Sequence, residues 1–221
     1  MLPISQSSLI FAPRYNVKRA DATGAFQPEA RRFRAHHDLP GSALILIDNH
    51  ATDGAMRRAV LAATARTMPS IGITVVAFFC HGTRSRIQLG FRAADVATLA
   101  GACARLGASD VHVALYACST GSGPGIDGDG GFADRLRDAL CREGAVRCSV
   151  LAHVTAGHTA RNPFVRIFDG AGSEEGGTGG YMPIKQSDPR WTRWVAALRD
   201  PASTLRYDLP LITQTNFAEW K

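Results

Sequence analysis

The stretch ITVVAFFCHG, residues 73–82, decides the fold class of this 221-residue chain. Its first eight residues carry no charge and are mostly β-branched or aromatic, a composition typical of a β-strand. Because the apolar residues do not alternate with polar ones, we expect this strand to be buried on both faces. Such strands belong to parallel sheets that helices cover on both sides. The stretch therefore predicts an α/β fold.

Similar apolar runs recur along the chain, and segments with helical spacing separate them. We expect further strands at residues 43–47, 111–117, 148–154 and 165–168. We expect helices at about 54–68, 93–106 and 132–142. This alternation predicts a three-layer sandwich with a mostly parallel central sheet and right-handed crossovers. The run ALILI at 43–47 is apolar on both faces, which favours a central strand of that sheet.

The two ends of the chain differ from this central part. Residues 1–40 are polar, basic and weakly patterned, so we expect an irregular N-terminal arm in which His36 and His37 are solvated. Residues 41–185 form the predicted α/β domain. In residues 186–221 an Asp-Pro pair precedes an amphipathic segment, which predicts a C-terminal helix and tail that pack on the core. The apolar face of that helix carries Trp191, Trp194 and Leu198.

Composition and charge narrow the range of partners. The formal net charge is +6, but no basic helix interleaved with aromatic residues is present, so we expect no nucleic-acid partner. No apolar stretch approaches the roughly 20 residues that span a bilayer. The first residues also lack the pattern of a secretory signal. These observations predict no membrane contact and a cytoplasmic location.

The cysteine pattern bears on redox chemistry and on metals. The number is odd and no Cys-x-x-Cys occurs, which argues against a disulfide framework and against a zinc site, so we predict no metal and no cofactor. A reducing compartment fits this pattern best. Residues 123–128 match G-x-G-x-x-G but lie in a long loop that contains proline, so we expect no nucleotide there. The cysteines are Cys80, Cys103, Cys118, Cys141 and Cys148.

Two residues with catalytic chemistry follow successive predicted strands. His81 comes directly after the strand at 73–80, and Cys118 comes directly after the strand at 111–117. Functional groups collect beyond the carboxyl ends of adjacent parallel strands. If these two strands are neighbours, the imidazole of His81 can accept the proton of the Cys118 thiol and later protonate a leaving amine. The thiolate is the nucleophilic form of cysteine, so this pairing predicts a cysteine nucleophile.

The residues around this pair resemble a known family. HGTRSRIQLG, residues 81–90, resembles the H-G-x-x-x-x-L-x-L-G turn of caspase-like domains related to the CHAT group of clan CD cysteine peptidases. ALYACSTG, residues 114–121, resembles their hydrophobic strand that leads into the cysteine. The segment that begins near Phe132 resembles the helix that follows. The resemblance covers about residues 43–168.

The resemblance implies a caspase-like fold and a thiol protease (a hydrolase) that cleaves a protein or peptide substrate with a His81–Cys118 dyad. It also implies that the amides of Gly82 and Cys118 form an oxyanion hole. The sequence departs from true caspases in two respects. Cys118 lacks their preceding Gln-Ala and following Arg-Gly, and the region before His81 is one βα unit shorter. A catalytically inactive relative that binds a protein partner is the alternative.

Further residues are candidates for substrate binding. Asp48 follows a predicted strand, where an acidic side chain suits a basic residue before the scissile bond; capping of the next loop is the alternative. His153 and His158, in the segment HVTAGH, either line the same cleft, where one of them is an alternative base, or lie in a surface hairpin. We expect the glycine-rich loops at 119–131 and 169–181 to border the cleft.

Overall fold

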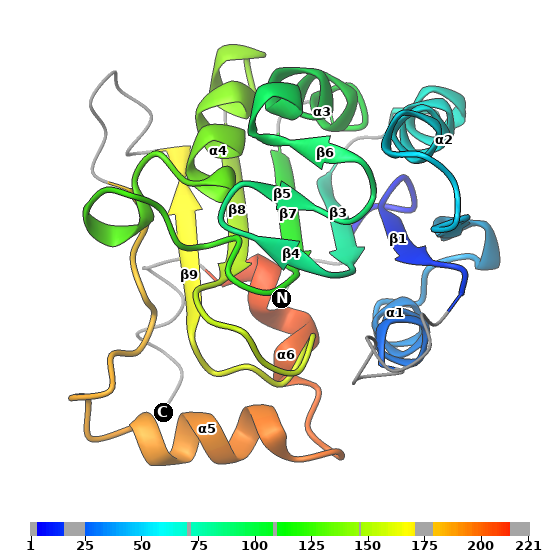
Figure 1. The fold of residues 1–221 in the computed structure, drawn as a ribbon. Coiled ribbons are helices and arrows are strands. Elements are labelled where there is room, and N and C mark those ends of the chain that lie inside the picture. The colour runs from blue at the N-terminus through cyan, green and yellow to red at the C-terminus, as the bar shows by residue number, and fades with distance from the viewer. Residues whose placement is uncertain are drawn as a thin grey trace.

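The computed structural model describes residues 4–15, 25–69, 72–107, 110–145, 147–170 and 179–212. These residues form a six-stranded sheet with helices on both faces (Figure 1). In the order β2-β1-β3-β7-β8-β9, neighbouring strands run parallel except that β9 runs antiparallel to β8. The strands are β1 (Leu9–Pro13), β2 (Leu44–Ile47), β3 (Ile73–Phe79), β7 (Asp110–Tyr116), β8 (Arg147–His153) and β9 (Val165–Asp169).

Helices cover the two faces of the sheet as separate layers (Figure 1). One layer comprises α2 (Asp53–Arg66), α3 (Val96–Ala104) and α4 (Phe132–Arg142). The other comprises α1 (Phe26–His36), α5 (Trp191–Arg199) and α6 (Leu205–Asp208). Successive strand residues point to opposite faces, so Phe78 and Leu115 pack in the first core and Phe79 and Tyr116 in the second. The α/β class and the mostly parallel sheet between helical layers are confirmed.

A small antiparallel sheet, β4–β6, follows β3 and consists of β4 (Gly82–Thr83), β5 (Arg86–Ile87) and β6 (Phe91–Arg92). It rests on the start of α2 through Gly90, which has a φ of +90°. A Cβ atom on Gly90 would lie 2.1 Å from the carbonyl oxygen of Asp53, so only glycine permits this approach. Short 3₁₀ helices span Gly41–Ala43, Ala93–Asp95, Ile126–Gly128 and Leu209–Leu211.

The prediction of an irregular arm at residues 1–40 is wrong for the part that the structure describes. β1 is buried along its whole length and pairs with both β2 and β3. α1 buries Phe26, Ala30 and Phe33 against the sheet, at the spacing of one helical face. These elements escaped prediction because β1 is short and has polar neighbours, and because arginines interrupt the apolar pattern of α1.

β2 is an edge strand, not the central strand that its apolar run predicted. Leu44, Ile45 and Leu46 are half-buried, and they divide between the two cores. The run is therefore apolar because both faces of β2 are covered. In the sheet, however, β2 pairs on one side, with β1. Since β1 lies between β2 and β3, the chain reverses its direction of winding there. This reversal creates a switch point at the carboxyl ends of β1 and β3, where ligands of such sheets bind.

The C-terminal helix packs on the core as predicted. α5 begins at Trp191. Trp194 and Leu198 are buried in the second core, and the indole N–H of Trp194 donates to the carbonyl oxygen of Pro163 over 2.9 Å. The predictions for 171–178 and for 213–221 fall outside the described residues. Within the described part, no helix has both the length and the apolar character needed to span a membrane.

Candidate active site

His81 and Cys118 follow neighbouring strands, which is the condition on which the predicted pairing depended. β3 and β7 pair in parallel with Phe79 opposite Tyr116, so His81 and Cys118 stand at equivalent positions two residues further on. Phe79 and Tyr116 both face the layer that contains α1, and the His81 ring contacts Phe26 of that helix. The sheet therefore brings the two predicted catalytic residues to one point of its carboxyl edge.

The turns that carry these two residues touch each other at Gly82. A Cβ atom on Gly82 would lie 2.7 Å from the Thr120 methyl group and 2.9 Å from both the Ala117 Cβ and the Cys118 carbonyl oxygen. Only a residue without a side chain fits between the two turns. Glycine after His81 is thus required by the close approach of the turn that holds Cys118.

The residue after Cys118 has a conformation that is rare outside glycine. Ser119 has a φ of +57°, in the left-handed region, where a side chain crowds the backbone. The turn is held by hydrogen bonds from the Thr120 hydroxyl to the Ala117 carbonyl oxygen (2.9 Å) and from the Ser122 hydroxyl to the Ser119 carbonyl oxygen (2.7 Å). Backbone strain of this kind concentrates at functional sites, since the surrounding structure must hold it in place.

Cys118 is one of two half-buried cysteines, and the other, Cys141, lies on α4 away from the strand ends. Cys80 and Cys103 are fully buried, and burial raises the pKa of each thiol to about 12. A hydrogen bond with Cys141, and then burial, raise the pKa of the Cys148 thiol. Cys118 is half-buried, and its thiol donates to the carbonyl oxygen of Gly157 over 3.5 Å. It is therefore the cysteine at the sheet edge that a substrate can reach.

Backbone and ring contacts fix the position of His81. Its N–H donates to the side-chain oxygen of Gln88 (3.3 Å), and its carbonyl oxygen accepts from the N–H of Gln88 (2.9 Å). Its half-buried ring meets Phe26 edge to face, with 4.8 Å between the ring centroids and an interplanar angle of 86°. Phe26 is the first residue of α1, so an element assigned to the irregular arm in fact orients the predicted catalytic imidazole.

Two backbone amides at this point are available to a ligand. The N–H of Gln88 donates to His81 across the Gly82–Ile87 pair, which makes that pair the non-hydrogen-bonded type of an antiparallel ladder. The ladder therefore does not use the N–H of Gly82. The N–H of Cys118 likewise has no acceptor among the described residues. These are the two amides that the family resemblance assigns to an oxyanion hole.

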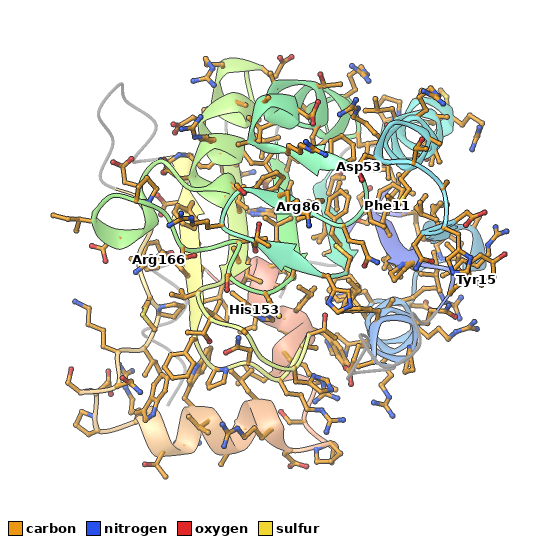
Figure 2. All side chains as sticks on the ribbon, viewed as in Figure 1. Phe11, Tyr15, Asp53, Arg86, His153 and Arg166 are labelled. Atoms are coloured by element: carbon orange, nitrogen blue, oxygen red, sulfur yellow. The ribbon has the colours of Figure 1, made fainter. Side chains whose placement is uncertain are left out.

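A cleft of about 430 Å³ opens beside His81. Its walls are the loop before α2, the first turn of α2, and the β4–β6 sheet. Asp53 enters from α2 and Arg86 from β5 (Figure 2), and Arg92 of β6 donates to the Asp53 carboxylate over 2.8 Å. The cleft thus offers hydrogen-bond donors and acceptors of both charges to a polar ligand.

Asp48 takes the capping role that was the alternative to substrate binding. Its side-chain oxygen accepts a hydrogen bond from the N–H of His50 over 3.0 Å, in the turn after β2. The His50 ring stacks on Tyr15 with 4.5 Å between centroids, and Asn49 exchanges hydrogen bonds with the Tyr15 backbone. Asp48 itself is exposed and outside the lining of the cleft.

The structure does not bring His153 and His158 into the cleft. His153 is fully buried at the end of β8, where no substrate reaches it (Figure 2). His158 is half-buried, and its Nδ1 accepts from the N–H groups of Ala160 and Arg161, so it caps a turn. It lines a second cavity of about 310 Å³ together with Gly157, the residue that contacts the Cys118 thiol. His153 is therefore excluded as a replacement for His81 as the base, whereas His158 directly follows Gly157, whose carbonyl oxygen accepts from the Cys118 thiol.

Sequence reasoning missed the charged residues of the cleft. Arg86 lies inside the recognised turn at 81–90, but its position gave no chemical signal. Asp53 and Arg92 are 39 residues apart, and they meet only because Gly90 rests on α2. A spacing in the sequence does not reveal such a contact.

Comparisons of the chain with family models, with curated proteins and with solved structures find no match.

Proposed function

We propose that this protein is a cysteine endopeptidase of caspase-like fold, with Cys118 as the nucleophile and His81 as the general acid and base. The observation that carries the proposal is the contact between the His81–Gly82 turn and the Cys118 turn at the ends of β3 and β7, with the N–H groups of both Gly82 and Cys118 unused. A nucleophile, a base and two oxyanion donors are the parts that acyl transfer needs.

The reaction follows from these parts. His81 accepts the thiol proton, and the Cys118 sulfur forms a bond to the scissile carbonyl carbon. The N–H groups of Gly82 and Cys118 stabilise the oxyanion that develops. The carbon–nitrogen bond then breaks, and the leaving amine takes the proton from His81. Water, deprotonated by His81, attacks the thioester carbonyl carbon; the carbon–sulfur bond breaks, the carboxylic acid is released, and His81 returns the proton to the Cys118 sulfur.

The cleft beside His81 is the proposed binding site for part of the peptide substrate. Its polar walls suit main-chain amides and a polar side chain of the substrate, with Arg86 and Asp53 as the charged contacts. A reducing compartment such as the cytoplasm keeps the nucleophilic thiol reduced, and no cofactor is required.

Hydrolysis of a fluorogenic peptide library tests the proposal. We expect the purified protein to cleave a subset of peptides in reducing buffer, and Cys118→Ala and His81→Ala each to lower the rate at least about 100-fold. Cys141→Ala is the matched control, because Cys141 is also half-buried but lies on α4, and it should keep full activity. Cleavage that persists in Cys118→Ala would exclude Cys118 as the nucleophile.

The second candidate is a catalytically inactive caspase-like module that binds a protein partner. It is favoured by one observation: the Cys118 thiol donates to the Gly157 carbonyl oxygen rather than to the His81 ring. Under this alternative no peptide is cleaved, and partner binding is the same in the wild type and in Cys118→Ala.

A further inference from the structure

Three potential metal ligands meet where the end of α1 lies against α6, away from the cleft. They are His36, His37 and Asp208, and one ligand atom of each lies within 4.8 Å of the others. His36 Nε2 is 2.8 Å from an Asp208 carboxylate oxygen, and the two histidine rings are 4.7 Å apart between centroids. The segments that supply them are about 170 residues apart, so the fold alone assembles the cluster.

A backbone carbonyl oxygen fixes the tautomer of the His37 ring. Its Nε2 lies 3.0 Å from the Tyr207 carbonyl oxygen, which can only accept, so this nitrogen carries the proton. The other ring nitrogen of the neutral imidazole then holds a lone pair. A histidine ligand commonly donates its second ring N–H to a backbone carbonyl, which fixes its tautomer and orientation.

The elements that carry the cluster are held together by a buried ionic network. Glu29 of α1 accepts hydrogen bonds from the Arg206 guanidinium (3.1 Å) and the Tyr207 hydroxyl (2.6 Å) of α6. Burial tends to raise the pKa of Glu29, but the Tyr207 hydrogen bond and the Arg206 charge outweigh it and lower that pKa. The carboxylate therefore stays ionised, and the two residues before Asp208 are fixed against the helix that carries the histidines.

From this arrangement we propose that His36, His37 and Asp208 form a binding site for Zn²⁺, a site that clips the C-terminal segment to α1. Two imidazoles and one carboxylate are a ligand set that suits Zn²⁺. Tetrahedral ligands at ~2.0–2.1 Å from the ion lie about 3.3 Å apart. His36 Nε2 and the Asp208 oxygen are closer than that, at 2.8 Å, and the three ligand atoms lie within 4.8 Å of one another, so side-chain rotations must adjust both spacings when the ion binds. The fourth position is open to water.

The cysteine pattern predicted no metal, and the irregular arm predicted solvated histidines. The structure changes the second expectation for His37, which is half-buried and hydrogen-bonded to Tyr207, whereas His36 is exposed. Zn²⁺ at this site binds the folded chain only, since α1 and α6 are apart in the unfolded chain. Its binding therefore stabilises the fold by mass action.

Isothermal titration with ZnCl₂, on full-length protein without a histidine tag, tests the site. We expect one Zn²⁺ per chain and, at saturating Zn²⁺, a midpoint of thermal unfolding about 5 °C higher. His36→Ala and Asp208→Asn should each weaken Zn²⁺ binding at least about tenfold and abolish the thermal shift. His36→Ala removes a surface ring, so it reports on binding even if Asp208→Asn fails to fold.

Two controls separate this site from others. His50→Ala removes a surface histidine outside the cluster and should bind Zn²⁺ like the wild type. A protein with both His81→Ala and Cys118→Ala should also retain the binding, which excludes the thiol and imidazole of the proposed active site as ligands. Absence of Zn²⁺ binding to the wild type, or binding that His36→Ala leaves unchanged, would overturn the proposal, and neither result bears on peptide cleavage.

Discussion

His153 ends β8 with its imidazole buried against Tyr116, and neither ring nitrogen has a hydrogen-bond partner among the described residues. Burial, and to a smaller extent the charge of His158, lower the pKa of His153 from 6.5 to about 3. The unfolded chain thus takes up a proton near pH 6.5, whereas the folded chain does so only near pH 3. Stability attributable to this residue is complete above pH 6.5 and is lost progressively as the pH falls towards 3.

His153→Phe should therefore stabilise the protein, because it keeps the ring shape and removes two unsatisfied nitrogens. We expect a gain of about 1 kcal/mol in the free energy of unfolding at pH 7. Between pH 7 and pH 5 the wild type should lose about 2 kcal/mol that the variant retains. Urea unfolding at both pH values measures the two effects.

His112 provides the matched control on the neighbouring strand. Its ring nitrogens contact the Ser149 hydroxyl (2.6 Å) and the Asp110 carboxylate (3.2 Å). His112→Phe leaves the Ser149 hydroxyl without its partner and removes one of the two partners of Asp110, the other being Arg147 at 2.9 Å, so it should destabilise the fold by about 1–3 kcal/mol. Equal effects of the two substitutions would show that the missing partners of His153 have no energetic consequence.

At the scale of residues the sequence predicts the positions of His81 and Cys118. Each follows a long apolar strand, so each is expected at the carboxyl edge of the sheet. It does not predict that His153 is sealed, because a histidine at a strand end is compatible with either face. Nor does it predict the meeting of His36 and Asp208, which depends on the packing of α6.

At the scale of elements, the packing of the β4–β6 sheet against α2 forms the cleft. Gly90 combines a φ of +90° with a Cβ position 2.1 Å from the Asp53 carbonyl oxygen. Gly90→Ala should lift the small sheet away from α2 and destabilise the protein by about 3 kcal/mol or more, since it adds a backbone clash to an unfavourable φ. The free energy of unfolding in urea gives the value.

Gly72 separates the two causes, because it has a φ of +119° and no atom within 4 Å of its Cβ position. Gly72→Ala should cost about 1–2 kcal/mol from the backbone conformation alone. If Gly90→Ala proves no more costly than Gly72→Ala, the close packing of the small sheet on α2 is not what holds it in place.

Whether an element is predicted depends on how long and how regular its apolar pattern is. β3, β7 and α4 are predicted well, since each has a long run or a clear helical periodicity. β1 is missed because five residues between polar neighbours give a weak signal, and its burial comes from strands on both sides. The edge position of β2 is not predicted, because an apolar run indicates that both faces of a strand are covered by helices. It does not indicate how many strands pair with it.

At the scale of the whole molecule, the order of strands creates the candidate site. Insertion of β1 between β2 and β3 puts the switch point next to β3, and pairing of β3 with β7 puts His81 beside Cys118. Helix α1 follows β1 in the chain, and its first residue, Phe26, contacts the His81 ring. The sequence predicts the layers of this fold, but the order of strands depends on long-range pairing that no local pattern specifies.

The reactivity of Cys118 tests the proposed dyad most directly. The measurement is the rate of iodoacetamide alkylation of each cysteine at pH 7, determined by mass spectrometry in the native wild type and in His81→Gln. We predict that Cys118 reacts at least about tenfold faster than Cys141, and that His81→Gln lowers the Cys118 rate to that of Cys141. Equal rates for the two cysteines in the wild type, or a Cys118 rate that His81→Gln leaves unchanged, would contradict a working pair of His81 and Cys118.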